Sequence, residues 1–242
     1  MPEQNLAAVW VYLSTTPLLG LTLTLMAYGL AYRIYLRYNA NPLLHPVAIS
    51  VTLLIALLML SDIPYADYFE GAQFVHFLLG PATVALAVPL YQQWTKLRRL
   101  WLPIGLALLV GVTMGALSSV LLAQMLGAGT QTVLSLAPKS VTAPVAMGIA
   151  EKIGGLPAMT AVFVVITGIL GAAVGTRLFA WMRIRDESIK GFAMGITAHG
   201  IGTARSFQIS PEMGAFSGLA MALATFTTAF LLPWIVDWLA LH

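Results

Sequence analysis

Long apolar stretches follow one another along almost the whole chain, with only short loops between them. They cover approximately residues 6–38, 43–61, 68–97, 99–126, 129–153, 157–182, 190–207 and 211–239. A membrane-spanning helix needs about 20 mainly apolar residues, so most of these stretches can cross a bilayer. Only 9% of the residues are charged, whereas a soluble domain carries about 25%. The sequence therefore predicts an all-α, polytopic integral membrane protein with about seven or eight membrane segments.

Charged residues in the loops predict which side each loop faces. The loop with Asp62, Asp67 and Glu70 has no lysine or arginine, so we expect it outside. Cytoplasmic loops carry an excess of lysine and arginine. We therefore expect three basic clusters in the cytoplasm: Arg33 and Arg37; Lys96, Arg98 and Arg99; Arg183, Arg185 and Lys190.

The last two basic clusters are separated by three apolar stretches, which cannot all cross if both clusters are cytoplasmic. Either one stretch does not cross, or one cluster breaks the rule. Stretch 129–153 contains Pro138 and Pro144, which interrupt a helix. We expect it to form a re-entrant hairpin or paired half-helices, entered from outside.

Further interruptions are expected within a single integral membrane domain, residues 1–242. Broken or re-entrant elements are predicted near 74–92, 129–153 and 190–207, the last because it is short and glycine-rich. A weak internal repeat relates 80–89 to 137–146 and aligns Thr83 with Ser140. Interrupted segments in corresponding positions are typical of transporter binding sites. The repeat conflicts with treating 68–97 as a full crossing, and the sequence leaves that conflict open.

A lysine lies at the predicted break in 129–153. Pro138 is expected to begin a new half-helix, whose free N–H groups, with Lys139, Ser140 and Thr142, suit a carboxylate. A charge at membrane depth usually faces a partner, a cavity or a substrate. The alternatives are that Lys139 reaches a lipid headgroup or pairs with Glu151.

A second candidate group follows around His199, whose imidazole can change charge near neutral pH and so couple transport to protons. Glu151 is a further candidate for that role. Gly200, Gly202 and Thr203 would bring backbone and hydroxyl groups to the ligand, and Arg205 would contact its carboxylate. The alternatives are a histidine satisfied by a neighbouring helix, and interfacial positions for Arg205 and Glu151. No catalytic constellation, metal-ligand cluster, cofactor motif or nucleic-acid-binding pattern is present, so we do not expect an enzyme.

Several strings identify a resemblance to the LrgB/CidB family, the larger partner of a two-component bacterial membrane system. They are Leu136–Ala146, Gly154–Phe163, Gly191–Arg205 and Gly214–Ala220. The Pro-Lys-Ser-Val-Thr and His-Gly-Ile-Gly-Thr-Ala-Arg strings are specific, whereas the first 40 residues carry little of the resemblance.

The resemblance implies a bacterial cytoplasmic (inner) membrane location and a small LrgA/CidA-like, holin-like partner. The family was named for antiholin or murein-hydrolase-export roles. Its plastid relatives are similar to glycolate and glycerate carriers, and bacterial members are linked to pyruvate movement. We therefore expect a proton-coupled transporter of small monocarboxylates. Such a transporter can assemble as a homo-oligomer. The alternative is an antiholin-like subunit that modulates a holin-like pore.

Overall fold

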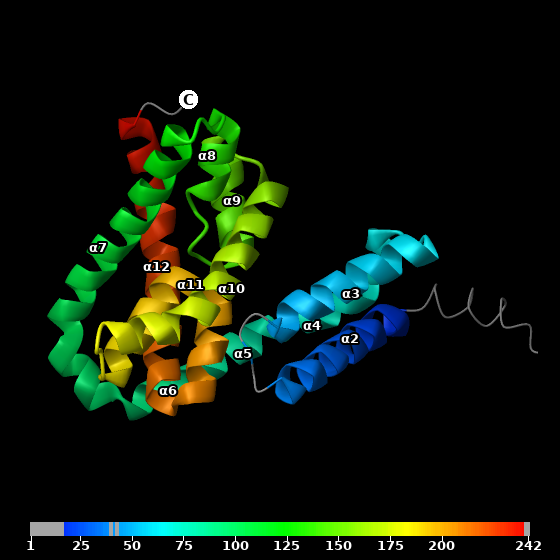
Figure 1. Cartoon of the computed structure of the whole chain (residues 1–242), viewed down its shortest axis with the longest axis horizontal. Helices are drawn as coiled ribbons and strands as arrows, with labels where there is room; N and C mark the ends of the chain where they lie inside the picture. The colour runs from blue at the N-terminus through cyan, green and yellow to red at the C-terminus, as the bar shows by residue number, and fades with distance from the viewer. Residues whose placement is uncertain (1–16, 39–40, 42–43, 240–242) are drawn as a thin grey trace, which may run out of the picture. The chain divides into compact units, whose positions relative to one another are not determined.

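A computed structural model of the chain describes residues 17–38, 41 and 44–239, and every regular element in this part is a helix (Figure 1). The first third of predicted stretch 6–38 lies outside the described residues. Contacts divide the chain into two compact units, residues 1–85 and 86–242. The prediction of one membrane domain stays a prediction.

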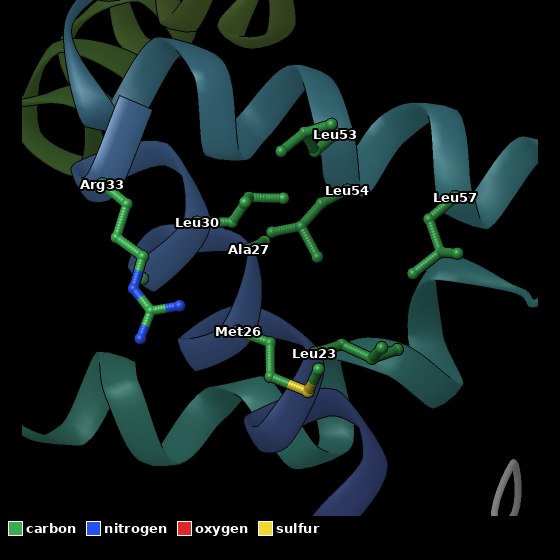
Figure 2. A pocket seen from close by; sticks show the side chains of 9 residues that line it. Leu23, Met26, Ala27, Leu30, Arg33, Leu53, Leu54 and Leu57 are labelled. Atoms are coloured by element: carbon green, nitrogen blue, oxygen red, sulfur yellow. The ribbon is translucent and has the colours of Figure 1, made fainter. Parts of the chain in front are cut away.

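The first unit contains α2 (Pro17–Arg37), α3 (Pro46–Ser61), α4 (Tyr65–Phe77) and α5 (Leu79–Ala85). Helices α2 and α4 touch at Gly20, where a Cβ would lie 2.1 Å from the Tyr68 carbonyl oxygen. An open hollow of about 600 Å³ lies between α2 and α3. Figure 2 shows Leu30 and Leu54 directed toward each other across it, with Arg33 at one end. Apart from Arg33, its lining is apolar, which suits a lipid acyl chain.

The second unit contains α6 (Ala87–Gln92), α7 (Trp94–Met125), α8 (Thr130–Leu136), α9 (Ala143–Ile153), α10 (Pro157–Trp181), α11 (Glu187–Ile209) and α12 (Pro211–Trp238). Helix α7 has 32 residues, so it is about 48 Å long. This length exceeds the thickness of the hydrocarbon core of a bilayer, which is about 30 Å. Helix α7 begins before Lys96, Arg98 and Arg99, which we expected in a loop between two stretches. These residues instead occupy its first two turns.

Helix α11 folds back on itself at His199, which has φ 40° and ψ −131°. A Cβ on Gly202 would lie 2.9 Å from the Met194 carbonyl oxygen, although eight residues of straight helix span about 12 Å. Likewise, the Ser210 Oγ lies 3.4 Å from Glu187 Oε2, so the two ends of the element meet. Helix α11 is therefore a helical hairpin with its tip at His199.

Helices α8 and α9 form a second fold-back, joined by residues 137–142. Beyond α9, the Leu156 N–H donates to Ser135 Oγ at 2.7 Å, and Thr160 Oγ1 donates to the Ser135 carbonyl at 2.9 Å. A Cβ on Gly155 would lie 2.9 Å from Ser135 N. The chain has thus returned to α8 by the start of α10.

Five stretches of the described chain are long and apolar enough to cross a membrane: 18–37, 65–92, 94–125, 157–181 and 211–238. The chain is therefore a helical, multi-pass membrane protein. Our expectation of seven or eight segments stays a prediction, because α3 has only 16 residues and α8, α9 and the two arms of α11 are shorter still. The interrupted stretch 65–92 contains α4, α5 and α6.

Candidate functional site

The turn between α8 and α9 is held by two short-range backbone bonds. Lys139 N–H donates to the Leu136 carbonyl at 3.1 Å, and Val141 N–H donates to the Pro138 carbonyl at 3.3 Å. Pro138 does not begin a helix, contrary to our expectation. Helix α9 begins at Ala143 with Pro144 in its first turn, where a missing N–H removes no helical bond.

Lys139 reaches from this turn to α7. Its Nζ lies 3.4 Å from the Gly115 carbonyl oxygen, and its side chain is half-buried. Within the described chain, no carboxylate lies within 4.0 Å of Nζ, and Glu151 is exposed in the last turn of α9. The Lys139–Glu151 pair, which we considered as an alternative to a ligand-binding lysine, is therefore absent from this part of the structure. The lysine has one long hydrogen bond and no counter-charge there.

A cavity of about 10 Å³ adjoins the turn. It brings together α7, the 137–142 turn, α11 and α12, and its lining consists of Gly111, Val112, Gly115, Ala116, Ala137, Pro138, Ser140, Ile196 and Thr228. This volume holds about one water molecule. A three-carbon acid fits only after these elements separate.

A larger hollow of about 370 Å³ lies between α7 and the first arm of α11. It shares Gly111 and Ile196 with the small cavity. A Cβ on Gly111 would lie 3.2 Å from two carbons of Ile196, so the absence of a side chain lets these helices approach. The contact between Gly111 and Ile196 separates the two hollows.

His199 is buried at the tip of α11, with its Nε2 2.9 Å from the Val164 carbonyl oxygen of α10. A carbonyl only accepts hydrogen bonds, so Nε2 carries the proton in the neutral tautomer. Thr203 Oγ1 donates to the His199 carbonyl at 2.8 Å and lies 2.9 Å from Ser217 Oγ of α12. Both side chains therefore fasten the hairpin to its neighbours.

The other predicted residues are dispersed. Gly202 packs inside the α11 hairpin, whereas Gly200 is exposed with open space around it. Arg205 lines a different hollow with Lys190. Thr83 lies in α5 of the first unit, and its side chain is outside the described residues. The structure brings Pro138, Lys139 and Ser140 together beside α7, with Thr142 at the end of the same turn. It does not bring Arg205 or Glu151 to them.

An ion-pair cluster that we did not predict joins the starts of α7, α11 and α12. Lys96 Nζ lies 3.1 Å from Asp186 Oδ2 and 2.7 Å from Glu212 Oε1. Asp186 caps α11 by accepting from the Ser188 and Ile189 N–H groups at 2.8 and 3.2 Å. Hydrogen bonding from the Ser188 hydroxyl, together with Lys96 and the cap, lowers the pKa of Asp186 to about 2. The sequence contained a signal for the Asp186 cap, because aspartate is a favoured residue at the N-cap of a helix.

The amino-acid sequence of the chain is similar to those of known proteins. The model of the LrgB-like family matches residues 24–238. The chain belongs to this family. YwbG of Bacillus subtilis (strain 168) is 36% identical over 222 residues, which cover 92% of this chain and 98% of YwbG.

Two further LrgB-like relatives have functional names. Holin-like protein CidB of Staphylococcus epidermidis is 29% identical over 90% of this chain and 95% of its own length. Antiholin-like protein LrgB of Bacillus cereus is 28% identical, with the same coverage of both chains. No solved structure matches the chain at a significant level. The family resemblance seen in the sequence is thus confirmed.

Proposed function

We propose that this LrgB-like protein carries small monocarboxylates, such as pyruvate, glycolate or glycerate, across the membrane. The observation that carries the proposal is Lys139, a half-buried cation in the turn between two short helices. Its one hydrogen bond there is to the Gly115 carbonyl at 3.4 Å, which leaves ammonium donors for a carboxylate. Ser140 lines the adjacent cavity and adds a hydroxyl donor.

The two fold-backs support a transporter topology. Helices α8 and α9 enter from outside and return, and the α11 hairpin enters from the cytoplasm. Helices α2, α3, the 65–92 stretch, α7, α10 and α12 then cross, which gives eight segments in all. All three basic clusters fall on the cytoplasmic side in this arrangement, as the positive-inside rule requires. Interrupted elements entering from opposite sides are a recurring way to build a carrier site near the bilayer centre.

The substrate route passes between α7 and the first arm of α11. The larger hollow borders Ser188 near one end of the second unit and ends at Gly111 and Ile196. Separation of these two residues joins it to the cavity beside Pro138 and Ser140. The described state is therefore closed toward the lysine. Opening requires α11 to move relative to α7.

His199 is the proton-linked group in this proposal. It occupies the hairpin tip and bonds through Nε2 to Val164 of α10. Its protonation adds charge at a buried position, which favours a hairpin arrangement in which the ring meets water or substrate. Proton binding and hairpin movement are thereby linked.

Uptake of labelled pyruvate into proteoliposomes tests the proposal. Lys139→Gln removes the cation from the turn, whereas the matched variant Lys152→Gln removes an exposed lysine at the end of α9. We expect the first to abolish proton-driven uptake and the second to leave it unchanged. Equal uptake by both variants contradicts the role of Lys139.

Gly115→Ala provides a second test that preserves the charge. A Cβ on Gly115 meets no atom within 4 Å, so the variant should fold normally. Because the methyl group meets no neighbouring atom, it points into open space and not into the small cavity that Gly115 lines, and we expect unchanged substrate binding. Weaker binding would contradict a substrate position on the Pro138 and Ser140 side of Gly115.

A second candidate function is modulation of a small, holin-like partner. The names of the relatives CidB and LrgB favour it, and they support it better than they support carboxylate transport. Dye release from liposomes containing a CidA- or LrgA-like partner, with and without this chain, tests this function. Modulation predicts that this chain changes the release rate, and that Lys139→Gln does so equally. If the chain transports carboxylates and does not modulate the partner, the dye should be released at the same rate with and without the chain.

A further inference from the structure

A separate hollow of about 250 Å³ lies beside the end of α10 and the open end of the α11 hairpin. Two cations line it: Lys190 from the first arm of the hairpin and Arg205 from the second. Thr176 contributes a hydroxyl group, and the remaining lining residues are apolar: Phe179, Ala180, Ile184, Ile209 and Met213. The lining therefore combines positive charge with a hydrocarbon surface.

The charges around this hollow are mainly positive. Lys190 Nζ lies 2.9 Å from Glu187 Oε1, and Arg205 Nη1 donates to the neutral Gln208 amide oxygen at 3.0 Å. Both basic side chains are half-buried. The lining residue Ile184 lies between the exposed Arg183 and Arg185. The residues that line the hollow include Lys190 and Arg205 and no acidic residue, so the lining favours an anionic ligand.

The neighbouring residues indicate the level of a membrane surface. Trp181 ends α10 with 81% of its surface exposed, and tryptophan is enriched where lipid headgroups meet hydrocarbon. Basic pockets between membrane helices on the cytoplasmic side bind anionic headgroups. We infer that this hollow binds an anionic phospholipid, with its phosphate on Lys190 and Arg205 and an acyl chain along Phe179 and Ile184.

The choice of ligand follows from the mixed lining. A free phosphate or a small carboxylate would use the two cations but would leave the apolar residues without a partner. A zwitterionic lipid would use the apolar surface but would bring its own cation toward Lys190 and Arg205. An anionic phospholipid uses both parts, and this site does not depend on what the Lys139 turn carries.

Native mass spectrometry of the purified full chain tests this site with phosphatidylglycerol and phosphatidylcholine. We expect one phosphatidylglycerol to be retained preferentially. Arg205→Gln and Lys190→Gln should each weaken retention about fivefold, since a basic residue near a membrane surface contributes about 1 kcal/mol. Arg205→Lys keeps the charge and should retain most binding, and Lys152→Gln should behave as wild type.

Thermal unfolding separates loss of binding from loss of folding. Each variant should unfold near the wild-type temperature in phosphatidylcholine micelles, while phosphatidylglycerol should stabilise only the chains with both charges. Equal retention of the two lipids by wild type overturns the inference. So does displacement of the lipid by millimolar inorganic phosphate, because the site would then be one for a soluble anion. Full retention by the Arg205→Gln, Lys190→Gln double variant also overturns it.

Discussion

Replacing Lys139 with methionine should stabilise the protein while removing carboxylate binding. The two side chains have similar length, so the change mainly removes charge from the 137–142 turn. In the described part of the chain the ammonium group has no carboxylate within 4.0 Å and bonds only to the Gly115 carbonyl at 3.4 Å. A buried lysine whose partner is a ligand is expected to lower the folding stability of the protein while the ligand is absent.

The size of this effect follows from two opposing terms. A lysine at the centre of a membrane helix costs roughly 2.5–3.5 kcal/mol by insertion scales. A hydrogen bond from a charged donor returns about 1.5–3 kcal/mol. The Gly115 bond is at the long end of the allowed range, so its contribution belongs near the lower value. The net gain for Lys139→Met is therefore about 1–2 kcal/mol, or about 2–8 °C in melting temperature for a chain of this size.

Intrinsic tryptophan fluorescence of detergent-solubilised protein during heating measures this shift, since the chain has 6 tryptophans. Lys152→Met is the matched control, and its melting temperature should stay within about 1 °C of wild type because surface substitutions have small effects. A fall of several degrees for Lys139→Met would refute the reasoning. Such a fall would mean that the lysine serves to attach the turn to α7.

Three further outcomes are expected. Gly195→Ala should lower the melting temperature by several degrees, because its Cβ would lie 2.2 Å from the Ser217 carbonyl oxygen and overpacking costs about 1–3 kcal/mol; an unchanged melting curve contradicts this. Asp186→Asn should destabilise the protein at pH 7 by no more than about 1 kcal/mol, since the carboxylate is partly exposed. Because the folded-state pKa of Asp186 is lowered from 3.8 to about 2, its contribution is present above the unfolded value and is lost as pH falls through about 2. The difference in melting temperature between wild type and variant should therefore close between those two values, and a constant difference down to pH 2 would exclude ionisation as its cause. His199→Gln keeps a donor for the α10 carbonyl but cannot titrate, so the pH dependence of pyruvate uptake should flatten; an unaltered pH profile rules out coupling through this residue.

The interruption at 137–144 was predictable because proline enforces it. Pro138 and Pro144 exclude a regular helix, and Lys139 between them marks the place as polar. The position of the new helix start was not predictable, since either proline fits a first turn. The membrane character of the chain was predictable from composition alone.

The fold-back at His199 has a weaker local signal. No proline lies within Glu187–Ile209, and the φ of 40° falls on a non-glycine residue. Gly202 allows the two arms to approach, but glycine is also common in straight membrane helices. The direction of Arg205 depends on this reversal, which turns it toward Lys190 and away from the Lys139 turn. Sequence neighbours of a candidate residue therefore need not share its site.

Equilibrium binding of labelled pyruvate to the purified chain tests most directly whether Lys139 holds the carboxylate. Flow dialysis of wild type, Lys139→Gln and Lys152→Gln under identical conditions gives the comparison, with the neutral analogue hydroxyacetone as competitor. We expect saturable binding by wild type and Lys152→Gln, no saturable binding by Lys139→Gln, and no competition by hydroxyacetone. Saturable binding of equal affinity by all three proteins would show that the carboxylate is held without this lysine.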